Sequence, residues 1–168
     1  MELIDLVPEF NLYEEYWKIY TKSHTLPPQY LAETSTVERS IIGAGSEIYG
    51  EVYNSVIGRG VTIGAGAVVR DSIIMNETSI GANCEINKAI IAENVTVSEN
   101  VKMGVGESAP NEMAPHIYTH DLVTIGEKSF VPKGVSIGKN TVISGVTTAA
   151  DYTDSYLASG KSIVKAGE

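Results

Sequence analysis

Three consecutive blocks of 17 residues read SVIGRGVTIGAGAVVRD (55–71), SIIMNETSIGANCEINK (72–88) and AIIAENVTVSENVKMGV (89–105). Within each block an apolar residue recurs after six, six and then five positions, and the series is Ile57, Ile63, Val69, Ile74, Ile80, Ile86, Ile91, Val97 and Met103. A second run keeps a spacing of six, at Ile125, Val131, Ile137 and Ile143, and an earlier partial coil holds Ile42 and Ile48. Self-similarity at a fixed short period is typical of repeat architectures.

The spacing excludes the common alternatives. An amphipathic helix would place apolar residues at i, i+3, i+4 and i+7, and a long amphipathic strand would alternate at period two. Here a short alternation such as Val61–Ile63 is broken at once by the turn Gly64–Gly66. Short β segments between tight turns at a fixed count predict an all-β fold, a parallel β-helix with three six-residue sides and the section of a triangular prism. The residues expected to stack inside it, one coil above the next at about 4.7–4.9 Å, are Ile57, Ile63, Val69, Ile74, Ile80, Ile86, Ile91, Val97, Ile125, Val131 and Ile137.

Composition narrows the function classes. The 168 residues are 43% hydrophobic and 20% charged, with a formal net charge of −9. Such an acidic chain argues against nucleic-acid binding, which needs clustered Lys and Arg. The single cysteine, Cys84, allows no intrachain disulfide. The first residues do not resemble a signal peptide, and no apolar run approaches the roughly 20 residues that span a bilayer. We therefore expect a cytoplasmic protein without a membrane partner.

The chain divides into a linker or capping segment, residues 1–36, and a β-helix domain, residues 37–168. Residues 11–19 favour a short helix with Asn11 as its N-cap, whose aromatic residues either cap the first coil or contact another surface. Residues 104–121, with two Pro and several polar residues, are expected to form a loop extruded from the β-helix. After Ser144 the repeat decays, and residues 162–165 favour a last strand.

The sequence shows no complete active site, and we expect no catalytic residue and no metal site. A catalytic zinc needs convergent ligands, but His116 and His120 fall in the loop and His24 precedes the repeat. An acyltransferase with His116 or His120 as general base is a second hypothesis. The Gly-rich turns 58–60 and 64–66 do not continue as a nucleotide-binding motif and are expected to be corners of the coils.

The chain also resembles a known family over nearly its whole length. Residues 8–30, with PEFNLY, WKIYT and LPPQY, are similar to the linker that leads into the C-terminal domain of bacterial ADP-glucose pyrophosphorylase (glucose-1-phosphate adenylyltransferase). Further similarity lies in VERSII (37–42), GAVVRDSIIM (66–75), KAII (88–91) and VPKG (131–134), and in the loop at Ala109–Glu112 and Ile117–Tyr118. The non-repeat linker is the specific part of this resemblance.

The resemblance implies a left-handed β-helix from an enzyme that makes ADP-glucose and pyrophosphate from ATP and glucose 1-phosphate in glycogen biosynthesis. The catalytic domain, which uses ATP and Mg, lies N-terminal in the family, so this chain is expected to lack it and to need no cofactor of its own. The implied partners are that catalytic domain, further copies in a homo-oligomer, and a sugar-phosphate or adenylate effector. A non-catalytic paralogue of the enzyme fits the same resemblance.

The effector site departs from the family pattern. Some members place arginines on the middle coil and on the loop, where this chain reads Gly81–Glu85 and Ile117–His120. The nearest cationic candidates for an allosteric anion site are therefore His120 and Lys128.

Overall fold

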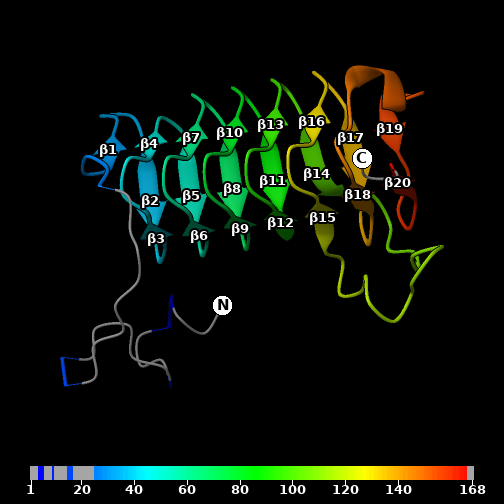
Figure 1. The fold of residues 1–168 in the computed structure, drawn as a ribbon, viewed down its shortest axis with the longest axis horizontal. Coiled ribbons are helices and arrows are strands. Elements are labelled where there is room, and N and C mark those ends of the chain that lie inside the picture. The colour runs from blue at the N-terminus through cyan, green and yellow to red at the C-terminus, as the bar shows by residue number, and fades with distance from the viewer. Residues whose placement is uncertain (1–3, 6–8, 10–14, 17–24, 166–168) are drawn as a thin grey trace.

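The computed structural model describes residues 4–5, 9, 15–16 and 25–165, and within them the chain winds as a parallel β-helix (Figure 1). The strands of successive coils lie side by side and build three sheets along one axis, which confirms the predicted parallel β-helix. Sheet A contains β1 (Tyr30–Leu31), β4 (Glu47–Ile48), β7 (Thr62–Ile63), β10 (Ser79–Ile80), β13 (Thr96–Val97) and β16 (Phe130–Val131). Sheet B contains β2 (Thr36–Glu38), β5 (Glu51–Tyr53), β8 (Val68–Arg70), β11 (Glu85–Asn87), β14 (Lys102–Val105), β17 (Ser136–Gly138) and β19 (Tyr156–Leu157). Sheet C contains β3 (Ile41–Ile42), β6 (Val56–Ile57), β9 (Ile73–Ile74), β12 (Ala89–Ile91), β15 (Val123–Ile125), β18 (Val142–Ser144) and β20 (Ser162–Val164).

The register aligns equivalent residues of successive coils. Ile63 pairs with Ile80 in sheet A, for example, one coil further along the axis. Because side chains alternate across a strand, this register stacks the second residue of most strands on its equivalents inside the prism. The eleven residues expected to form these stacks are each at most 1% exposed: Ile57, Ile63, Val69, Ile74, Ile80, Ile86, Ile91, Val97, Ile125, Val131 and Ile137.

A second set of buried residues lies two positions before each inward aliphatic, where the chain turns a corner. These residues are small, and several are hydroxylic, which the aliphatic spacing did not predict. The Thr78 hydroxyl donates to the Ala92 carbonyl at 2.8 Å and accepts from the Val95 N–H at 3.3 Å. Cys84 occupies the same kind of corner, and burial raises the pKa of its thiol. Such hydrogen bonds allow polar side chains to remain in an apolar interior.

The corners combine two backbone requirements. Gly81 faces the next coil so closely that a Cβ would lie 2.7 Å from the Glu99 nitrogen. Elsewhere the corner residue has a positive φ, and many of these residues are not glycine: Arg39, Asn54, Asp71, Glu77, Asn83, Lys88, Asn94, Asn100, His120, Asp121, Lys128 and Asn140. Asn and Asp tolerate the left-handed region better than most residues, so the fold depends on Asn as well as on Gly at its corners.

The structure shows where the described part of the β-helix begins and ends. The first described strand, β1, begins at Tyr30, inside the segment that the sequence suggested as a linker, and pairs with β4. The helix expected at residues 11–19 lies almost wholly outside the described residues. Beyond Ser144 the chain forms a 3₁₀ turn, η2 (Ala149–Asp151), then β19 and β20, so the expected last strand is present. Among the described residues, no helix has the length and apolar character to cross a membrane.

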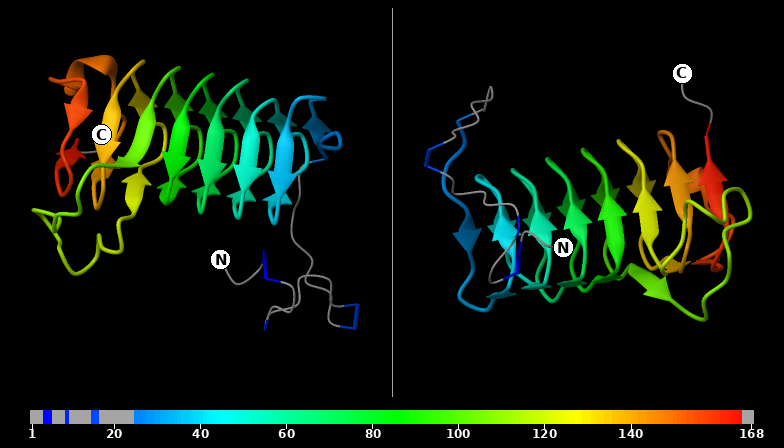
Figure 2. Two further views of the ribbon diagram at one scale, coloured as in Figure 1. Left: turned by 180° about the vertical axis from the view of Figure 1, so that it is seen from behind. Right: turned by 90° about the horizontal axis from the view of Figure 1, so that it is seen from below.

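The loop between β14 and β15 leaves one corner of the prism near its C-terminal end (Figure 2). It spans residues 106–122, close to the predicted 104–121, and it does not continue any of the three sheets.

Candidate functional site

The two allosteric candidates lie at opposite ends of β15. His120 ends the loop, with φ +61°, and Lys128 forms the next corner, with φ +57°. The His120 ring nitrogen Nδ1 lies 2.6 Å from the Thr119 hydroxyl oxygen, and Lys128 pairs with Glu127 at 2.9 Å. The structure therefore places the two candidates at opposite ends of β15, and an effector site at either remains a prediction.

The other chemical candidates do not converge. His116 is exposed near the tip of the loop, and His24 lies outside the described residues. Within the part of the chain that the structure describes, no group of three or more His, Cys, Asp and Glu side chains could hold a metal ion. The turn 58–60 contains Arg59, whose side-chain nitrogen Nε lies 4.0 Å from the carboxylate oxygen Oε1 of Glu77 in the next coil. Both Gly-rich turns are corners of the β-helix, and no helix follows either of them.

A pocket of about 370 Å³ opens on the last coil, at the C-terminal end of the prism. Its walls include Tyr152, Tyr156, Leu157 and Ile163. Burial raises the pKa of Tyr152 to about 12, so this phenol stays protonated at neutral pH.

The most distinctive surface is the outer face of sheet C. Its outward row aligns Ile41, Val56, Ile73 and Ile90 in register, and each is only partly buried. Met75, which follows β9, is 40% exposed beside this row. We call this surface the aliphatic stripe, and define it by these five residues.

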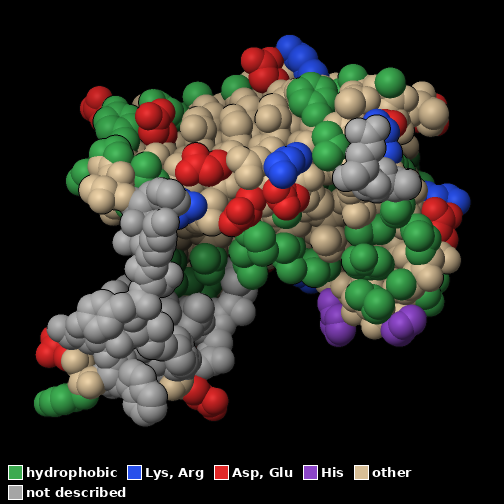
Figure 3. Space-filling model, viewed as in Figure 1, with side chains coloured by type: hydrophobic (Ala, Val, Ile, Leu, Met, Phe, Trp, Pro, Cys, Tyr) green, Lys and Arg blue, Asp and Glu red, His purple; other side chains and the backbone are tan. Residues whose placement is uncertain are grey.

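The other two sheets carry outer rows that are mainly polar. In sheet A the aligned outward residues are Glu47, Thr62, Ser79 and Thr96, with the aromatic Tyr30 and Phe130 at the two ends of the row. In sheet B the row contains Glu51, Val68, Glu85 and Lys102, and Lys102 pairs with Glu85 at 2.9 Å. Figure 3 shows charged side chains over sheet B, which faces the viewer, and apolar side chains along the lower edge, where β6, β9 and β12 lie. The three sheets therefore share an apolar inner row and differ chiefly in the side chains of their outer rows.

Sequence reasoning about single inward positions missed the stripe, although a signal was present. The first four strands of sheet C each contain an aliphatic doublet, Ile41–Ile42, Val56–Ile57, Ile73–Ile74 and Ile90–Ile91. In a strand, two adjacent aliphatics must point to opposite faces, so each doublet predicts one apolar side chain outside.

The family of the chain follows from comparison with known proteins. A protein-family model described as the EIF2B subunit epsilon LbH (left-handed β-helix) domain matches residues 18–108. The chain is 59% identical over its whole length to a glucose-1-phosphate adenylyltransferase of Lachnospira eligens, of which it covers 40%. It is 46% identical over its whole length to that of Acetivibrio thermocellus, covering 39%, and 52% identical over 95% of its length to that of Thermotoga neapolitana, covering 38%.

The chain spans about 40% of the length of these relatives. The repeat, the three parallel sheets and the comparisons agree with one another. The chain belongs to the left-handed β-helix domain family that this model describes, and its resemblance to the C-terminal β-helix domain of the glucose-1-phosphate adenylyltransferases is confirmed.

Proposed function

We propose that this chain is the non-catalytic β-helix domain of a glucose-1-phosphate adenylyltransferase, and that it packs on the catalytic domain through the aliphatic stripe. The enzyme would convert ATP and glucose 1-phosphate to ADP-glucose and pyrophosphate for glycogen biosynthesis in the cytoplasm. We assign this chemistry, with the ATP and Mg that it uses, to the catalytic domain.

The aliphatic stripe is the observation that carries the proposal. Four β-branched side chains, each only partly buried, lie in one row on the outer face of sheet C, and aligned apolar side chains that water reaches can mark a site of protein contact. Around 60% of the length of each relative lies outside the match, since the chain covers about 40%. That remainder supplies a partner large enough to cover the stripe.

The test uses the unmatched part of the Lachnospira eligens relative, expressed separately and titrated with this chain in a calorimeter. We expect a complex that Ile73→Lys weakens at least tenfold, because the substitution would bury a charge at the contact. Ser79→Lys is the matched control, since Ser79 lies on the same coil but faces outward from sheet A. Equal affinities of the two variants would refute docking through the stripe.

We further propose that the domain contributes to homo-oligomer assembly and to the binding of a sugar-phosphate or adenylate effector. His120 and Lys128 are its cationic candidates, although they lie on different corners. Titration of the chain with AMP, fructose 1,6-bisphosphate and acetyl-CoA separates the alternatives. Loss of sugar-phosphate or AMP binding on His120→Ala or Lys128→Ala would support the effector site, whereas binding of acetyl-CoA alone would favour an acyltransferase.

A further inference from the structure

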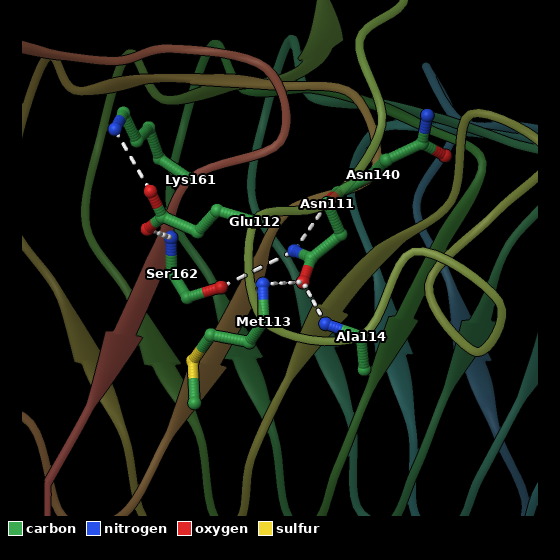
Figure 4. A network of polar contacts seen from close by, with 7 residues as sticks. All are labelled: Asn111, Glu112, Met113, Ala114, Asn140, Lys161 and Ser162. Atoms are coloured by element: carbon green, nitrogen blue, oxygen red, sulfur yellow. Dashed lines mark hydrogen bonds and ion pairs between the residues drawn. The ribbon is translucent and has the colours of Figure 1, made fainter.

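The loop 106–122 lies against the later coils of the prism and is held there by a buried amide. Asn111 is 2% exposed. Its side-chain nitrogen donates to the Asn140 carbonyl at 2.8 Å and to the Ser162 hydroxyl at 3.2 Å, and its side-chain oxygen accepts from the Met113 and Ala114 N–H groups at 3.0 Å (Figure 4). One side chain therefore joins the loop to the two coils that follow it.

The next residue, Glu112, binds the edge of the last strand. Its backbone N–H donates to the Gly160 carbonyl at 2.9 Å. One carboxylate oxygen accepts from the Ser162 N–H at 3.1 Å, and the other pairs with Lys161 at 2.8 Å. Figure 4 shows the Glu112 carboxylate between the Lys161 ammonium and the Ser162 backbone nitrogen.

The Ser162 N–H has a counterpart in earlier coils of sheet C. Val142, which aligns with Ser162, donates its N–H to the carbonyl of Lys161 one coil further on, and Thr124 donates in the same way to Thr141. Among the described residues no further coil follows β20, and the Glu112 carboxylate stands where the next carbonyl would be.

A second side-chain amide, that of Asn140, binds both ends of the loop. Asn140, 5% exposed, donates to the Ala109 carbonyl at 2.9 Å, and its side-chain oxygen accepts from the Asp121 N–H at 2.8 Å. The loop also presses on the last coil, since a Cβ on Gly160 would lie 2.2 Å from the Pro110 carbonyl oxygen.

We infer that loop 106–122 is a strap that locks the last coil, with Glu112 capping the exposed edge of β20 in place of a further coil. An edge strand with free N–H groups invites pairing with another strand, and the strap occupies that edge. Contacts made to the strap therefore control whether residues 155–165 stay ordered. This role is independent of the proposed enzyme, because it rests on contacts within the chain.

Hydrogen exchange of the whole chain, measured by mass spectrometry, tests whether the strap keeps the last coil ordered. Glu112→Ala should accelerate exchange in β19 and β20 by about tenfold or more, because local opening no longer breaks the cap, while β5, β8 and β11 keep their protection. Glu112→Gln should retain much of the protection, since its amide oxygen still accepts from Ser162. Glu107→Ala is the control, a charge removed from an exposed position in the same loop.

A pair of glycine variants provides a second measurement. Gly160 and Gly134 both have positive φ, +77° and +73°, but a Cβ on Gly134 would meet nothing within 4 Å. Both Ala variants carry the backbone strain, and only Gly160→Ala pushes against the strap. We expect Gly160→Ala alone to accelerate exchange in the loop and β20 together. Unchanged exchange of β20 in Glu112→Ala, or equal acceleration in every coil or in both glycine variants, would overturn the inference.

Discussion

At the scale of single residues, the two neighbours in each strand of sheet C have different roles. Ile74 points inward and is 1% exposed, whereas Ile73 lies on the outer row. We expect Ile74→Ala to lower the free energy of unfolding by about 2–5 kcal/mol through lost burial and a cavity. Ile73→Ala should cost less than about 1 kcal/mol in the isolated chain, where water already reaches the side chain. Urea denaturation measures both, and equal losses would contradict the assigned directions.

At the scale of elements, ionised carboxylates of the loop 106–122 help to attach it to the last coils. The Lys161 hydrogen bond lowers the pKa of Glu112, and the Ser108 hydroxyl and the Lys139 ammonium lower that of Asp121, with a smaller effect from Lys88. A carboxyl group whose pKa is lowered by folding stabilises the folded state above its unfolded pKa, about 4.3 for Glu and about 3.9 for Asp. That contribution disappears as the pH falls through the lower pKa of the folded protein.

The strap should therefore loosen in acid. We expect the stability difference between the native chain and Glu112→Gln to be constant from pH 7 to about 5 and to shrink below about 4. Denaturation in urea at a series of pH values measures it. Other carboxylates of the last coil, such as Asp151, which pairs with Lys165, titrate in both proteins. Their contribution to the pH dependence therefore cancels in the difference. A difference that grew toward low pH would show that the charged form of Glu112 destabilises the fold.

At the scale of the whole molecule, stability comes from contacts between neighbouring coils, as in other solenoids. Glycines such as Gly81 set how closely two coils approach, because a Cβ there would overlap the backbone of Ser98 and Glu99. We expect Gly81→Ala to lower the free energy of unfolding by about 1–3 kcal/mol by forcing the coils apart. Thr96→Ala, at an exposed position of β13, should change it by less than about 0.5 kcal/mol. Thermal or urea unfolding of the two variants would decide, and a similar loss in both would argue against tight coil spacing at Gly81.

The β-helix could be predicted from the sequence, because a fixed period of apolar residues can be buried on one side only if each coil stacks on the next. It also located the loop and the last strand, since Pro, polar residues and a lost period interrupt the coils. The spacing could not show that corners hold Asn, Asp and Lys at positive φ, because those residues look like ordinary surface positions.

Contacts between residues far apart in the chain could be found only in the three-dimensional structure. Asn111 and Ser162 lie 51 residues apart in the chain yet share a hydrogen bond, and no local pattern encodes that contact. The separation of His120 from Lys128 across β15 likewise follows from the direction of one strand. The stripe appears only when four strands align in register. Residues of the repeat contact the equivalent residues of the next coil, so their periodic spacing predicts their neighbours. Residues of the loop contact whichever coil the path of the chain brings beside them, and no period predicts that.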